Sequence, residues 1–231
     1  MSRILIPYYS RSGHTRQLAI KLAEELAARG HEIVLENIQA VRERNKWRLV
    51  PPLLPLLPLL PLYLLHAPFR HWWLDHYHQP EQDIKPLIHH SVSGFDIIIL
   101  GGPKWLYISY PVARYLNLVK GLDGKMVGVF ATFCGPPLEI FELEMLFRPL
   151  EDRITAKGAA VVSTLAISSQ HHPFFFFGEM EHLFQWISKK AFRRPLCEFS
   201  LASEWGRKEV IRFCDNLEAA AGRQSPRSLS A

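Results

Sequence analysis

The pattern of apolar and polar residues at the start of the chain predicts a strand, a helix and a second strand. Residues 3–9 form an almost unbroken apolar run, typical of a strand buried on both faces. Apolar residues then recur at helical spacing, and Gly30 follows where a helix C-cap belongs. Residues 31–37 supply the second strand. Units of this kind build parallel sheets. The helical apolar positions are Leu18, Ala19, Leu22, Ala23 and Leu26.

The same alternation continues along the rest of the chain. Short apolar runs predict three more strands, and amphipathic segments predict the helices between them. One of these helices should stop before Pro149, because proline has no amide hydrogen to donate. We expect strands at 95–100, 125–132 and 159–167, and helices at 111–121, 138–147 and 203–221, the last with Val210, Phe213, Cys214 and Leu217 inward.

Five strands that alternate with helices predict an α/β fold with a doubly wound, five-stranded parallel sheet. Ligands of such sheets bind outside the carboxyl ends of the strands, so the loops after strands one, three and four are the candidate site. We expect a single domain over residues 1–222, with insertions at about 40–90 and 168–200 and a disordered tail at 223–231.

The two insertions are apolar and carry basic residues, unlike the core around them. The first contains Arg42, Arg44, Lys46 and Arg48, a Pro-Leu-Leu repeat with the period of a polyproline helix, and an aromatic, histidine-rich stretch. The second contains Phe174–Phe177 and two basic pairs. The exposed leucines need cover, from the phenylalanine cluster or a second subunit, from a membrane surface reached through residues 42–78 and Trp72, Trp73 and Tyr77, or from a substrate tunnel.

Composition narrows the class of protein. Lys and Arg outnumber Asp and Glu by 27 to 22, an excess that suits an anionic partner, although we expect no nucleic acid. The three cysteines have no paired spacing, which favours a reducing compartment, and no export signal is visible. Five prolines interrupt the most apolar stretch, which argues against a membrane span. The chain is therefore expected to be cytoplasmic, with peripheral membrane contact as an alternative.

The loop from Ser10 to Thr15 carries the clearest chemistry. A phosphate requires several amide or hydroxyl donors at a helix N-terminus, whose partial positive charge also favours an anion. Ser10, Ser12 and Thr15 offer hydroxyls, and Gly13 allows close approach of the backbone. Plain capping of the helix is the alternative interpretation.

Residues 4–19, ILIPYYSRSGHTRQLA, resemble the first strand and phosphate loop of flavodoxins and flavodoxin-like NAD(P)H:quinone oxidoreductases, with the motif T/S-x-T/S-G-x-T. Residues 95–116 resemble the third strand, aromatic loop and following helix of that family, and residues 125–135 resemble its fourth strand and second flavin loop. The resemblance covers the core in order but neither insertion. It implies the strand order 2-1-3-4-5 and the cofactor FMN.

The resemblance also implies which residues hold the FMN. One loop would bind the phosphate, and two would border the isoalloxazine ring, which proteins hold by stacking and apolar cover. The phosphate loop consists of Ser10, Arg11, Ser12, Gly13, His14 and Thr15; one side of the ring would face Pro103, Lys104, Trp105 and Leu106, and the other Thr132, Phe133, Cys134 and Gly135.

Several of these positions leave alternatives open. Trp105 can instead be a core or dimer-interface aromatic, with Tyr107 and Tyr110 as substitutes for the stacking role. Lys104 replaces a small hydroxyl residue and would place a positive charge near the flavin, while Cys134 is either a redox thiol or a small packing residue. The histidines between 66 and 78 lack the spacing of a metal site, so no metal is expected.

The leading hypothesis is an FMN-dependent oxidoreductase that passes electrons from NAD(P)H to a quinone-like or other apolar acceptor. A non-enzymatic electron carrier that docks on a protein or membrane partner is the first alternative. Carrier flavodoxins are acidic and this chain is basic, which argues against docking on the same partners. The second is a flavin-free binding scaffold. No catalytic residue is identified, and a homo-oligomer is an open alternative.

Overall fold

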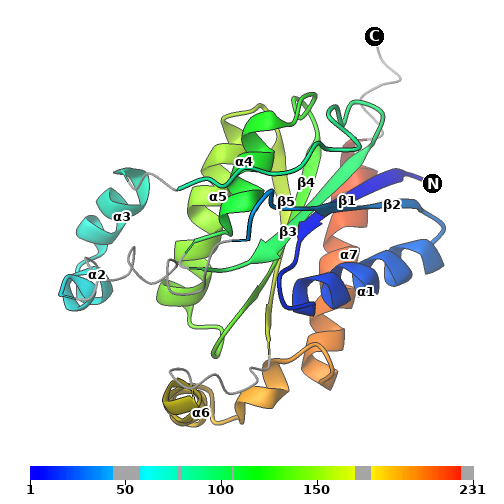
Figure 1. Ribbon diagram of the computed structural model, residues 1–231. Coiled ribbons are helices and arrows are strands. Elements are labelled where there is room, and N and C mark those ends of the chain that lie inside the picture. The colour runs from blue at the N-terminus through cyan, green and yellow to red at the C-terminus, as the bar shows by residue number, and fades with distance from the viewer. Residues whose placement is uncertain (44–57, 77–79, 106, 170–177, 225–231) are drawn as a thin grey trace.

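A computed structural model describes residues 1–43, 58–76, 80–105, 107–169 and 178–224. Its centre is a five-stranded sheet in the order β2-β1-β3-β4-β5, in which every neighbouring pair is parallel (Figure 1). The predicted fold class and strand order are confirmed. The strands are β1 (Arg3–Tyr9), β2 (Glu32–Ile38), β3 (Ile97–Pro103), β4 (Met126–Phe133) and β5 (Ala160–Ser168).

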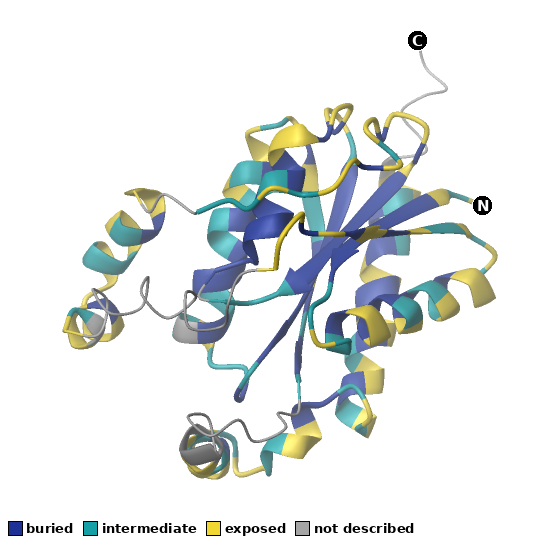
Figure 2. Cartoon of the chain, in the orientation of Figure 1, coloured by how far each residue is buried: buried dark blue, intermediate teal, exposed yellow. Residues whose placement is uncertain are grey.

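Helices cover both faces of the sheet. On one face, α1 (His14–Ala28) and α7 (Glu204–Gln224) pack against Ile4, Ile6 and the other side chains of that face. On the opposite face, α4 (Tyr110–Leu118) and α5 (Met145–Thr155) pack against Leu5 and Ile98. The inner strands β1, β3 and β4 are almost entirely buried, which explains their apolar runs, whereas the edge strands β2 and β5 are partly exposed (Figure 2).

The third strand is longer than its apolar run. It continues through Gly101 and Gly102 to Pro103, past the predicted end at residue 100. A side chain at Gly101 would clash with the ring of Phe130 on the neighbouring strand, so the glycine allows β3 and β4 to pack closely. The extension carries the chain directly into the candidate site.

The expected helix stop before Pro149 is wrong. A π-helical turn, η3 (Glu139–Glu144), leads into α5, which continues through Pro149 to Thr155. An internal proline costs about 3 kcal/mol or more, but each large apolar side chain that the helix buries returns about 1.5–3 kcal/mol. The buried side chains of α5 are Met145, Leu146, Phe147, Leu150 and Ile154.

The insertions leave from β2 and β5, as predicted, and contain helices. The first forms α2 (Leu60–Leu65) and α3 (Ala67–His76); the second forms α6 (Gly178–Phe192) and a 3-10 turn, η4 (Leu196–Phe199). The polyproline prediction is therefore wrong at residues 60–65. Pro61 fits the first turn of α2, and the ring of Tyr63 is fully buried, so tertiary packing selects the helix.

Parts of both insertions lie outside the described residues. These parts include Arg44, Lys46 and Arg48, the first half of the Pro-Leu-Leu repeat, and Phe174–Phe177. Within the described ranges, no helix is long and apolar enough to cross a membrane.

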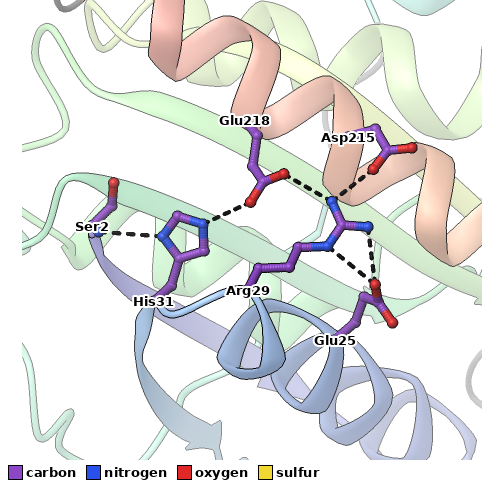
Figure 3. Close-up of polar contacts among 6 residues, drawn as sticks. All are labelled: Ser2, Glu25, Arg29, His31, Asp215 and Glu218. Atoms are coloured by element: carbon purple, nitrogen blue, oxygen red, sulfur yellow. Dashed lines mark hydrogen bonds and ion pairs between the residues drawn. The ribbon is translucent and has the colours of Figure 1, made fainter.

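The closing helix is fixed to the first helix at the amino edge of the sheet (Figure 3). The Arg29 guanidinium bonds Asp215 at 2.7 Å, Glu218 at 2.9 Å and Glu25 at 2.9 Å. His31 joins Glu218 at 3.0 Å and accepts a hydrogen bond from the amide of Ser2. The His31 ring and the Arg29 guanidinium lower the pKa of the Glu218 carboxyl. This network lies at the edge opposite the candidate site and has a structural role.

Candidate functional site

The β1–α1 loop presents an uncapped helix N-terminus. Gly13 is the N-cap residue, with φ 92°, and no side chain caps α1. The capping alternative therefore does not describe this loop. A Cβ atom added to Gly13 would meet nothing within 4 Å, and the Ser10 hydroxyl oxygen is buried without a partner. The loop thus has donors to offer and open space in front of Gly13.

Thr132, at the end of β4, joins the three predicted loops. Its hydroxyl lies 2.7 Å from the hydroxyl of Thr15, and both side chains are buried. Its carbonyl accepts a hydrogen bond of 2.8 Å from the amide of Lys104. The loops that follow β1, β3 and β4 therefore meet at one residue, as the carboxyl ends of parallel strands allow.

Replacing Thr132 with valine should reduce the free energy of unfolding by about 1–3 kcal/mol, because the buried Thr15 hydroxyl would lose its partner. Urea unfolding measures this change. Thr132→Ser should retain most of the stability, and a Thr15→Val/Thr132→Val double variant should recover part of it. The hydrogen bond between the two hydroxyls would be contradicted if the double variant lost more free energy of unfolding than the two single variants together.

Trp105 packs between aromatic rings of two neighbouring elements. Its ring is edge-on to Tyr9, with centroids 5.7 Å apart, and to Tyr110 at 5.2 Å. It is partly buried against the core below the site. Tyr107 and Tyr110 are buried, and the Tyr107 hydroxyl accepts a hydrogen bond of 2.6 Å from Trp73 on α3. Trp105 is thus the more exposed ring of this loop; Leu106 lies outside the described residues.

Lys104 is not a free positive charge. Its ammonium group lies 2.6 Å from the carboxylate of Glu142 on η3, and the two side chains are only 6% and 5% exposed. Burial raises the pKa of Glu142, while the lysine opposes that shift. The site therefore holds a buried, mutually compensated ion pair where the sequence showed a lone lysine. Short π-helical segments are frequent at functional sites.

Cys134 is half-buried and lies near this ion pair. Burial, followed by the charge of Glu142, raises its thiol pKa to about 12. Such a thiol stays protonated at neutral pH and is a poor nucleophile, which favours the packing interpretation over the redox one.

The rest of the β4 loop is tied to the second insertion. Phe133 is buried, and its carbonyl accepts hydrogen bonds from the amide of Ser169 at 2.8 Å and from its hydroxyl at 3.0 Å. Gly135 has φ 101°, and a Cβ there would lie 3.1 Å from the ring of Phe184 on α6. The second insertion therefore packs directly on a predicted ring-bordering loop.

A small pocket adjoins the start of α1, next to the β1–α1 loop. Its volume is about 160 Å³, below the roughly 300–1,000 Å³ of pockets that enclose drug-sized ligands. It can accommodate a small group but not a whole flavin nucleotide. The lining residues are His14, Gln17, Leu18, Thr132, Ile167, Ser168, Ser169, Ser200, Leu201 and Ala202.

Sequence reasoning missed three residues of the site. Glu43 accepts a hydrogen bond of 2.8 Å from the Tyr9 hydroxyl and lies 3.9 Å from the Arg11 guanidinium. Glu142 and Phe184 come from segments treated only as a helix and an insertion. None of the three adjoins a predicted loop in sequence, so only the tertiary structure identifies them.

One histidine of this stretch, together with Asp75, helps to dock α3, whereas His76 bonds within the helix. His71 lies 3.4 Å from Glu144, Asp75 bonds Arg148 at 2.9 Å, and His76 bonds the Trp72 carbonyl at 2.8 Å. In the part of the chain that the structure describes, no three His, Cys, Asp or Glu side chains gather as metal ligands.

The flavodoxin-like strand order is now joined to three converging loops. The chain has a flavodoxin-like fold. No family model and no curated protein matches it. One similar solved structure is a flavoprotein in complex with FMN from Lactobacillus acidophilus NCFM, with 19% sequence identity, a match over 72% of this chain and 93% of that chain, and a TM-score of 0.48. Another is oxidised Flavodoxin 2 from Bacillus cereus, with 21% identity, a match over 82% of this chain and 99% of that chain, and a TM-score of 0.43. A two-electron reduced flavodoxin from Megasphaera elsdenii is also similar, with 18% identity, a match over 71% of this chain and 84% of that chain, and a TM-score of 0.40.

These identities leave the ligand and chemistry of this flavodoxin-like chain to be argued from its own residues.

Proposed function

We propose that this flavodoxin-like chain binds FMN and uses it to transfer electrons from NAD(P)H to a quinone-like or other apolar acceptor. The observation that carries the proposal is the junction at Thr132, which brings the β1, β3 and β4 loops together beside an uncapped helix N-terminus. A ligand with a phosphate and a flat ring requires that combination.

The residues present fit such a group. The N-terminal amides of α1, the unpartnered Ser10 hydroxyl and the hydroxyls of Ser12 and Thr15 would bind the phosphate. The β3 and β4 loops, with Trp105 on one and Gly135 on the other, would border the ring. When bound, FMN supplies the capacity to accept two electrons and pass them on. The chain's part is to orient the ring, exclude water and hold the charges near it.

The enzymatic interpretation is supported by charge and by apolar surface. The net charge of +5 differs from the acidic surfaces by which carrier flavodoxins dock on their partners. The helices of both insertions carry exposed apolar residues and lie beyond the carboxyl edge of the sheet (Figure 1), where an apolar acceptor would arrive. A carrier or a flavin-free scaffold remains the competing function.

Titrating the purified, ligand-free protein with FMN tests the proposal. We expect saturable binding, a yellow complex with absorbance at roughly 450 nm, and weaker binding of riboflavin, which lacks the phosphate. If the protein shows no binding of FMN, the scaffold function is supported and both redox functions are contradicted.

Anaerobic reduction separates the enzyme from the carrier. Adding NADH or NADPH to the FMN complex should bleach the flavin absorbance, and a soluble quinone should restore it. Dithionite serves as the control for a flavin that can be reduced. Bleaching by dithionite alone would favour the carrier.

A further inference from the structure

The outward face of α6 is apolar at its centre. Leu183 and Trp186 are 44% and 59% exposed and stand one helical turn apart. The opposite face of α6 is fixed to the protein: Phe184 packs on Gly135, Ser188 is buried and bonds the Arg194 carbonyl at 2.7 Å, and Phe192 meets Phe199. The exposure of Leu183 and Trp186 therefore follows from the way the helix docks.

Cations follow this apolar face at one end of the helix. Residues 182–199 contain four cations, Lys189, Lys190, Arg193 and Arg194, and one carboxylate, Glu198, which lies 3.9 Å from Arg194. In the sequence, Glu179 and Glu181 stand at least eight residues before Lys189. An apolar centre with a tryptophan and a basic flank is typical of a helix that lies in a membrane interface.

A second apolar surface projects from the first insertion. Leu62 and Trp72 are 44% and 54% exposed, and Leu65 is 87% exposed. The α2–α3 pair is held in place by the Trp73–Tyr107 hydrogen bond of 2.6 Å and by the Arg70–Glu144 ion pair of 2.8 Å. These leucines and Trp72 therefore face outward while the hairpin itself is anchored.

Both surfaces extend beyond the carboxyl ends of the strands. In Figure 1, α2 and α3 lie at the left and α6 at the bottom, away from both termini. Helices of both insertions therefore project at the carboxyl edge of the sheet, where one extended partner can contact both.

We infer that α2–α3 and α6 together dock the protein on an anionic lipid bilayer. Leu62, Leu65, Trp72, Leu183 and Trp186 would enter the headgroup region, and the cations at the end of α6 would attract the anionic lipids. Docking in this orientation turns the carboxyl edge of the sheet toward the bilayer, in which apolar acceptors dissolve. That consequence rests on the proposed function, whereas membrane binding itself does not.

Co-sedimentation of the full chain with lipid vesicles tests the inference. The protein should bind vesicles containing phosphatidylglycerol, bind neutral phosphatidylcholine vesicles weakly, and dissociate as salt is raised. Leu183→Ala/Trp186→Ala should weaken binding at least about tenfold, since two apolar side chains leave the interface. Lys189→Glu/Lys190→Glu should remove the preference for anionic vesicles. Leu118→Ala, 41% exposed at the amino edge, is the matched control and should bind as wild type.

Several outcomes would overturn the inference: no sedimentation with anionic vesicles, equal sedimentation with neutral ones, or unchanged binding by the α6 variants. Light scattering adds another, because a dimer that dissociates on Leu183→Ala/Trp186→Ala would make this face a subunit interface. FMN titration of the same samples keeps the two proposals separate. If the α6 variants lose vesicle binding but retain FMN binding, the two proposals stand independently. If the wild type binds vesicles but not FMN, the proposed function fails while membrane docking stands.

Discussion

Replacing Glu142 with leucine should lower the free energy of unfolding by about 3–5 kcal/mol, the cost of removing the carboxylate that neutralises a buried ammonium group. Lys104 lies 2.6 Å from Glu142, and both side chains are at least nine-tenths buried. A lysine in such a place must either lose its proton or draw water into the core. Both responses destabilise the folded chain.

Lys104→Met should cost less, because Glu142 can become neutral by binding a proton. Burial already raises the pKa of this carboxyl, and removing the lysine removes the charge that opposes the shift. A carboxyl with a raised folded pKa stabilises the fold below its unfolded pKa, and that contribution is lost as the pH rises through the folded pKa. The stability difference between wild type and Lys104→Met should therefore shrink as the pH falls toward about 4, near the unfolded pKa of glutamate.

The Lys104→Met/Glu142→Leu double variant is the decisive comparison. Removing both charges often leaves stability nearly unchanged, so this variant should be more stable than Glu142→Leu alone. Urea unfolding of all four proteins gives the coupling energy. Additive losses would show that the two side chains contribute independently and that the ion pair is not formed.

The contrast between the strands and this ion pair shows what the sequence could predict. Runs such as residues 4–9 are buried on both faces, so their apolar pattern alone identifies them as strands of a parallel sheet. Loop order then follows from the strand order. The partner of Lys104 is 38 residues away on a different element, and no local pattern marks such a pairing.

The polyproline prediction for the first insertion was wrong for a related reason. A Pro-Leu-Leu repeat satisfies the period of a polyproline helix, yet residues 60–65 form an α-helix. What decides between them is the burial of Tyr63 against Leu74, Tyr107 and Met145, which come from three other elements. Local periodicity is a weak constraint where tertiary contacts determine the conformation.

Gly13→Leu should reduce the affinity for FMN by about 100-fold or more, the equivalent of losing one or two charge-assisted hydrogen bonds. Gly13 has φ 92°, and its absent side chain faces open space at the start of α1. A leucine there would occupy the position proposed for the phosphate. It would also strain the backbone, because side-chain-bearing residues disfavour this conformation by about 1–2 kcal/mol.

Gly30→Leu is the control that separates backbone strain from blockage of the phosphate position. Gly30 has φ 86° and, like Gly13, nothing within 4 Å of an added Cβ, but it lies at the other end of α1. The two variants should lose similar stability in urea, and isothermal titration should show FMN affinity lost only in Gly13→Leu. Riboflavin has no phosphate, so its affinity should fall much less in the Gly13 variant than that of FMN. An equal loss of both ligands would place the defect in the fold of the loop and contradict a phosphate at Gly13.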